Sequence, residues 1–182
     1  MKAKLLIAAS FVALATMGFD CINDPLIVSV SLDPFSHCYQ INPGPNVNYG
    51  GQTIIDPNTL MDDSYRDKVE DARVYDITVQ STGSFSGTVS NGIVTINGVP
   101  ILTYSGSWSD FSTPQSLVRR SSHIQKNNAG IQELLRSLRQ RPLLPDTLGA
   151  SGTLSGGGVP PVPAGLGVCV NIYAQIDANI KH

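Results

Sequence analysis

The chain has 182 residues, of which 12 are basic and 14 acidic, and its formal net charge is −2. A weakly charged, slightly acidic composition argues against nucleic-acid binding, which needs a concentration of lysine and arginine. The 17 glycines and 12 prolines, set against 7% aromatic residues, favour a turn-rich β protein over a helical bundle.

The first residues have the pattern of a secretory signal peptide. Lys2 and Lys4 precede an apolar run, 5–15, which closes on Ala-Leu-Ala. This run is too short for a membrane-spanning helix, which needs about 20 apolar residues. We therefore expect residues 1–18 to be a signal peptide, cleaved after Ala15 or Gly18, and residues 19–182 to form a single β-rich domain. The protein is expected to be exported and to act in a periplasm, in association with an outer membrane, or extracellularly.

Export would place the three cysteines in an oxidising compartment. Cys38 and Cys169 both lie in strand-like segments, and we expect a disulfide between them. Cys21 lies near the mature terminus, where chains are poorly ordered, so we expect it to be free or to bond to another molecule. Asp20 is a poor residue directly before a lipidated cysteine, which argues against lipidation of Cys21.

The middle of the chain has the pattern of an antiparallel meander. A short helical turn is expected in the segment 58–71, and Pro57, directly before this segment, would be the first helical residue. Alternating or β-rich segments then predict four strands, over 73–81, 84–90, 93–96 and 99–108. Asn91-Gly92 and Asn97-Gly98 both suit a type I′ turn, yet few residues separate them. We expect Asn91-Gly92 to be the hairpin turn and the other pair to be the one that can form a bulge.

One amphipathic helix is expected after these strands. Ile124, Ile131, Leu134, Leu135 and Leu138 fall on one stripe with a period of 3.6 residues. An asparagine at position 127 or 128 can cap the start of the helix, and the proline at 142 ends it.

The C-terminal segment gives the clearest strand pattern. A strand over 147–155 and a Gly/Pro-rich loop over 156–163 lead into it. Every even position from 168 to 180 is then apolar, which gives a strand with one apolar and one polar face. We expect Ile172, Ile176, Phe85 and Trp108 to lie in the core and Tyr173 to face outward.

Together these elements predict a mainly β fold, an antiparallel β-sandwich or strongly curved sheet with one amphipathic α-helix packed on it. A small outer-membrane β-barrel is an alternative, because long alternating strands are typical of barrels. Its two aromatic girdles are hard to build from 5 Phe, 6 Tyr and 1 Trp spread unevenly along the chain.

The sequence contains no motif of a catalytic, cofactor or metal site. The centre of Gly83-Ser84-Phe85-Ser86-Gly87 is Phe, where a nucleophile elbow needs Ser. His37, His123 and His182 have no partner at metal-ligand spacing. We therefore expect a non-enzymatic protein with no cofactor and no metal.

Basic side chains are concentrated in the second half of the chain, at Arg119, Arg120, Lys126, Arg136, Arg139 and Arg141. The last three alternate with the leucine stripe, so we expect them to face outward and, with Arg119 and Arg120, to form a surface contact. Anionic lipid headgroups would suit them. So would the acidic segment 56–76 of another copy. The alternative is a solvated surface with no partner.

Two function classes remain open. We expect an exported, non-enzymatic envelope or secreted protein that acts as a binding or structural module. It would contact a protein partner or itself through a β surface and the basic helix, and it would bind no nucleic acid. The alternative is a lipid or apolar-ligand carrier, whose cavity of about 300–1,000 Å³ would lie between the curved sheet and the helix. A filled core would favour the binding module.

Overall fold

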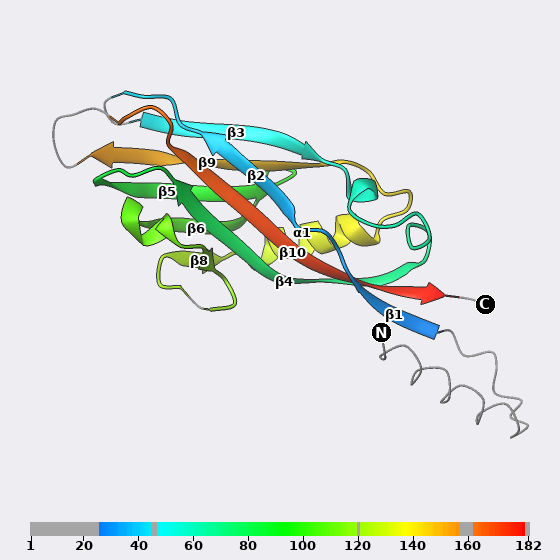
Figure 1. The fold of residues 1–182 in the computed structure, drawn as a ribbon. Helices are drawn as coiled ribbons and strands as arrows, with labels where there is room; N and C mark the ends of the chain where they lie inside the picture. The colour runs from blue at the N-terminus through cyan, green and yellow to red at the C-terminus, as the bar shows by residue number, and fades with distance from the viewer. Residues whose placement is uncertain (1–25, 45–46, 120, 157–161, 181–182) are drawn as a thin grey trace, which may run out of the picture.

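A computed structural model describes residues 26–44, 47–119, 121–156 and 162–180 (Figure 1). The predicted signal peptide and Cys21 lie outside these residues. The strands of the described part are β1 (Leu26–Ser31), β2 (Phe35–Gln40), β3 (Val47–Ile55), β4 (Val69–Thr82), β5 (Gly87–Ile96), β6 (Val99–Ser107), β7 (Gln115–Ser116), β8 (Ile124–Lys126), β9 (Asp146–Gly156) and β10 (Gly167–Ile180). Its helices are α1 (Asn128–Arg139) and two short 3₁₀ helices, η1 (Pro57–Thr59) and η2 (Trp108–Ser112).

The strands form two antiparallel sheets that enclose one hydrophobic core. Sheet I has the order β1-β10-β4-β7, and β2 pairs with β10 on the same edge as β1. Sheet II has the order β3-β9-β5-β6-β8. Helix α1 packs against β4, β5 and β6 (Figure 1). The prediction of a β-sandwich with one packed helix is confirmed.

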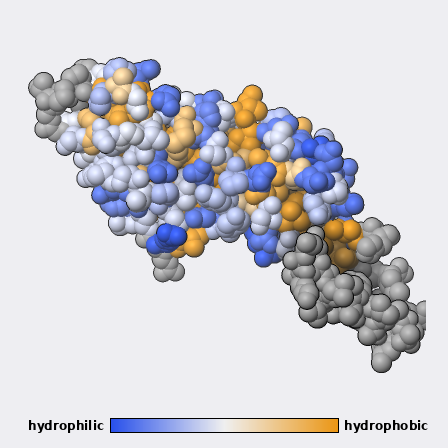
Figure 2. All heavy atoms as spheres, in the orientation of Figure 1, coloured by the Kyte–Doolittle hydropathy of each residue, from blue (hydrophilic) through white to orange (hydrophobic). Residues whose placement is uncertain are grey.

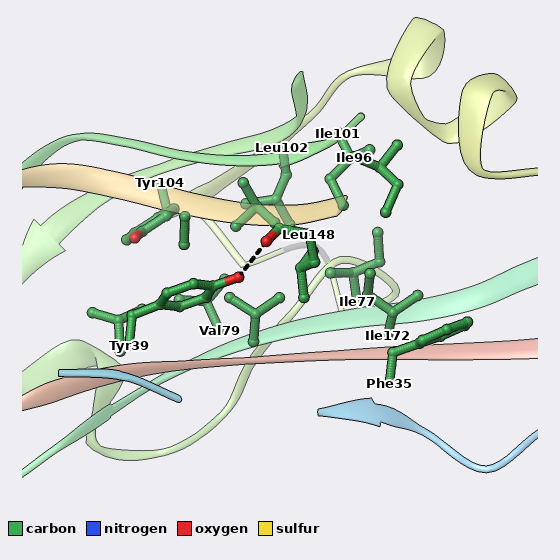
Figure 3. Packing of buried hydrophobic residues seen from close by; sticks show 14 of the residues in the cluster. Phe35, Tyr39, Ile77, Val79, Ile96, Ile101, Leu102, Tyr104, Leu148 and Ile172 are labelled. Carbon is green, nitrogen blue, oxygen red and sulfur yellow. Dashed lines mark hydrogen bonds between the residues drawn. The ribbon is translucent and has the colours of Figure 1, made fainter. Parts of the chain in front are cut away.

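Strand β10 confirms the alternation in the C-terminal segment. Its even-numbered residues from Val168 to Ala178 are at most 2% exposed, and the intervening residues from Asn171 onward are half-buried. Ile172 is completely buried opposite Phe35 of β2 and Ile77 of β4 (Figure 3). The even-numbered side chains pack into the core between the sheets, and pairing with β1 and β2 on one side and β4 on the other covers both backbone edges of the strand.

The choice between the two Asn-Gly pairs was wrong. Asn97 and Gly98 connect β5 to β6 and have φ values of 49° and 80°, the two positive values that a type I′ turn requires. Asn91-Gly92 lies inside β5, at a register shift of both strand pairings, and is a bulge. A Cβ atom at Gly92 would lie 2.6 Å from the ring of Tyr104, so the absent side chain makes room for that ring.

Phe85 is half-buried rather than a core residue, whereas Trp108, Ile172 and Ile176 are in the core as predicted. The expected strand over 84–90 begins only at Gly87. A Cβ atom there would lie 2.1 Å from the Phe85 ring, which shows that this ring folds over the start of the strand. The Phe85 and Trp108 rings are nearly perpendicular, with centroids 6.4 Å apart, and the indole nitrogen of Trp108 donates to the Gly83 carbonyl at 3.0 Å.

Helix α1 begins after the predicted Asn127 cap and carries four of the five stripe residues, but Ile124, which was expected on the helix, lies in the short strand β8. The Asn127 side chain accepts a hydrogen bond from the Ala129 amide at 3.0 Å, which caps the first turn. A Cβ atom at position 130 would lie 2.0 Å from the Pro100 carbonyl oxygen, so Gly130 allows the helix to approach the backbone of β6. The expected helical turn after Pro57 is limited to η1, and the chain enters β4 at Val69. No helix among the described residues is both long and apolar enough to cross a membrane.

Candidate binding surface

A surface groove of about 540 Å³ lies on the outer face of sheet I. We call it the outer groove. Its lining is formed by Tyr75, Asp76, Thr78, Thr113, Pro114, Ser116, Val118, Arg119 and Tyr173. Figure 2 shows one side of the molecule, on which hydrophobic residues gather in separate groups among hydrophilic ones.

A β-bulge in β4 builds the groove. The pairing of β10 with β4 shifts register between Tyr173, which is opposite Asp76, and Ala174, which is opposite Val74. Tyr75 is therefore an extra residue on β4. Val74 and Ile77 pack toward the core, while Tyr75 and Asp76 both line the groove. Bulges re-aim side chains in this way, and here the bulge places a second aromatic ring beside Tyr173.

The exposed side chains of the outer groove suit a protein contact. The Tyr75 and Tyr173 rings lie 5.9 Å apart between centroids, and Tyr75 is 46% exposed. Val118 is 63% exposed. Arg119 is exposed, and its side chain has no ion pair within the described part of the chain. Tyrosine and arginine are among the residues enriched where alanine substitution most weakens protein–protein binding.

The Asp76 carboxylate forms hydrogen bonds with other groups of the groove. Its carboxylate accepts hydrogen bonds from the Ser116 hydroxyl at 2.8 and 2.9 Å, from the Val118 amide at 3.3 Å and from the Ile77 amide at 2.8 Å. The Ser116 hydroxyl oxygen in turn accepts from the Arg119 amide at 3.2 Å. These bonds tie the segment that carries Val118 and Arg119 to β4. Part of the groove lining thus lies on the paired strands β4, β7 and β10, and the segment outside the strands is joined to them by these hydrogen bonds.

The arginines predicted to form one surface lie in different places in the structure. Arg136 is exposed and forms an ion pair with Glu133 on the same helix at 2.6 Å. Arg119 lines the outer groove, whereas Arg136 and Arg139 line a different surface depression. Arg120 lies outside the described residues.

Arg139 and Arg141, both expected to face outward, make contacts within the chain. Arg139 forms an ion pair with Asp71 and donates to the Ala72 carbonyl at 3.0 Å. Arg141 donates to the carbonyls of Leu138 and Gln140 and, at 3.4 Å, to that of Val69, and burial lowers the pKa of its guanidinium group. The acidic segment expected to attract the helix of another copy thus contacts the helix of its own chain. A contact of these arginines with a second molecule stays a prediction.

A second depression, of about 420 Å³, is lined by His123 together with Tyr104, Ser105 and Ser122. The nearest recorded charge partner of His123 is Asp110, whose carboxylate oxygen lies 3.7 Å from Nδ1. That oxygen also accepts from the Ser107 amide at 2.9 Å. Among the described residues, no hydrogen bond joins the His123 ring to a serine or cysteine side chain, and no three His, Cys, Asp or Glu side chains are placed to hold a metal ion. The absence of enzymatic activity stays a prediction.

The predicted disulfide between Cys38 and Cys169 is confirmed. The two residues are directly opposite one another in the pairing of β2 with β10, and their Cα atoms are 3.9 Å apart. The bond closes a loop between residues 131 positions apart and fastens an edge strand to the central strand of sheet I.

Comparisons with known proteins identify no family. No family model matches the chain, and no curated protein matches it by sequence. A chain from a solved structure of Desmodium yellow mottle tymovirus aligns with 88% of this chain over 91% of its own length, at 10% identity and a TM-score of 0.36. A similarity of this size says nothing about function.

Proposed function

We propose that this protein is an exported, non-enzymatic binding module that recognises a partner protein through the outer groove. The observation that carries this proposal is the pair of exposed Tyr75 and half-buried Tyr173 in the same groove as Arg119, an arginine with no ion pair among the described residues. The cross-strand disulfide fits export, because such bonds persist in oxidising compartments.

The chemistry of the outer groove favours a segment that carries an acidic side chain next to an apolar one. The Arg119 guanidinium can hold a carboxylate through two parallel hydrogen bonds. The tyrosine rings and Val118 offer apolar contact within the same groove. Asp76 is the acidic residue of this lining, and its carboxylate is held by hydrogen bonds from Ser116, Val118 and Ile77 rather than by Arg119.

A carrier of apolar ligands has less support. The even-numbered residues of β10 were expected to line its cavity, yet they are buried against the side chains of both sheets (Figure 3). Tyr39 crosses the space between the sheets and donates to the Leu148 carbonyl at 2.9 Å. Tyr49 and Tyr104 are joined by a hydrogen bond of 2.7 Å in the same core. The pockets described above are open surface grooves rather than a space between the sheets.

Selection from a random peptide library displayed on phage tests the proposal. The immobilised wild-type protein should enrich peptides that combine acidic and apolar residues. The selected peptides should bind Tyr75→Ser/Tyr173→Ser and Arg119→Gln variants much more weakly in fluorescence-polarisation titrations. Because these side chains lie on the surface, the thermal unfolding midpoint of each variant should stay close to that of the wild type.

The Arg136→Gln variant is a matched control, since it removes an exposed arginine outside the groove. It should bind the selected peptides as the wild type does. Enrichment of no peptide, or of peptides that bind the tyrosine and Arg119 variants with unchanged affinity, would refute the assignment of the outer groove.

A further inference from the structure

The two sheets differ in how their edges are protected. In sheet I, β7 is only two residues long, and the opposite edge is divided into β1 and β2 by a break that contains Asp33 and Pro34. In sheet II, the edge strand β8 has three residues and ends in Lys126. Short strands, prolines and lysines are the usual devices that keep a sheet edge from pairing with another chain.

Strand β3 carries none of these devices. It is nine residues long, Val47–Ile55, and contains neither a proline nor a charged residue. It pairs with β9 along its whole length without a register shift. On its other side, no strand among the described residues pairs with it (Figure 1). Ile54 is 74% exposed near one end.

We infer that β3 is a docking edge for a second copy of this chain. Two β3 strands would pair antiparallel about a two-fold axis at Gly51, and sheet II of each copy would continue into sheet II of the other. The uncharged strand meets no repulsion when it faces itself, and an antiparallel two-fold arrangement uses the same surface on both copies.

The central register is the one that pairs all nine residues. It places Val47 opposite Ile55, Asn48 opposite Ile54, Tyr49 opposite Thr53 and Gly50 opposite Gln52 of the other copy. Residues of the same parity oppose one another, so the core-facing side of one sheet continues into the core-facing side of the other. The exposed Ile54 side chain gains a neighbour, and at the axis each Gly51 leaves the space of its missing side chain to the Tyr39 ring of its own chain. This association uses a different sheet from the outer groove and does not depend on the proposed function.

Sedimentation equilibrium over a concentration series tests the inference. The wild type should form dimers as its concentration rises, and hydrogen exchange of the β3 amides should slow in the same range. The Asn48→Lys/Ile54→Lys variant places like charges opposite each other in two symmetric pairs, so it should stay monomeric. The Asn48→Glu/Ile54→Glu variant should do the same. A mixture of the two variants should restore a one-to-one dimer, because each pair then joins opposite charges.

The Ile27→Lys/Leu144→Lys variant is the matched control, since it adds the same charge at exposed positions outside β3 and should dimerise like the wild type. A wild type that stays monomeric would overturn the inference. So would β3 amides that exchange equally fast in dilute and concentrated samples, or a lysine variant that dimerises unchanged. Failure of the mixed variants to pair would overturn the register. Peptide binding at the outer groove is read out separately, so this inference and the proposed function can fail independently.

Discussion

Removal of the Cys38–Cys169 disulfide should cost the protein a large part of its stability. The bond joins residues 131 positions apart, so it restricts the unfolded chain strongly. The chain-entropy expression for a loop of this length gives about 5 kcal/mol at 25 °C. The folded state should change little, because the two residues remain neighbours in the register of β2 and β10. A loss of this size is comparable to the whole stability of many domains, which is about 5–15 kcal/mol.

The measurement is urea unfolding of a Cys38→Ala/Cys169→Ala variant against its disulfide-bonded parent. Both proteins carry Cys21→Ser, so that no third thiol can exchange with the bond. A fall of about 4–5 kcal/mol in the free energy of unfolding is expected, and reduction of the parent should reproduce it. A fall below about 1 kcal/mol would refute the argument that the disulfide acts mainly by restricting the unfolded chain.

Three further predictions concern the core and the helix contact. Ile172→Ala should lower the free energy of unfolding by about 2–5 kcal/mol because it opens a cavity in a completely buried site. Tyr173→Ala should lower the free energy of unfolding clearly less, since it loses mainly the outward contact with the Tyr75 ring. If urea unfolding showed a larger loss for Tyr173→Ala than for Ile172→Ala, the faces of β10 would be inverted. Burial raises the pKa of Tyr49 to about 12, so its neutral phenol contributes stability below pH 10 that is lost as the pH rises from about 10 to 12. The urea midpoint should fall over that range, and less steeply in Tyr49→Phe; an equally steep fall would contradict this cause. A double-mutant cycle of Arg139→Gln with Asp71→Asn should give a coupling below about 1 kcal/mol, because both side chains are substantially exposed. A larger coupling that does not weaken with salt would show that this ion pair is shielded from solvent.

Local patterns in the sequence were sufficient for the elements whose signals repeat along the chain. The alternation over residues 168–180 predicted both the strand and its buried face, because successive side chains of a strand point to opposite sides. The leucine stripe and the Asn127 cap predicted α1 within a residue of its observed start. The disulfide was also predicted, because Cys38 and Cys169 both lie in strand-like segments. The structure shows that these two strands are neighbours, which brings the cysteines together.

The two Asn-Gly pairs show where local reasoning stops. Asn91 and Asn97 both adopt positive φ, so the residue types alone do not distinguish the bulge from the turn. The partner strands decide between them. Strand β5 continues past Asn91 because β9 pairs with it on both sides of the bulge, and the Tyr104 ring occupies the space beside Gly92.

The candidate surface was likewise decided by tertiary structure. The positions of the arginines between the leucines indicated which side chains point away from the apolar face of the helix. They could not show that Asp71, which is far away in the sequence, forms an ion pair with Arg139. The outer groove depends on a bulge that appears only when β4 and β10 are paired, since the register shift turns Tyr75 toward Tyr173. A strand's own sequence determines which side chains alternate, whereas its neighbours determine where that alternation is interrupted, and in this protein the interruption forms the groove.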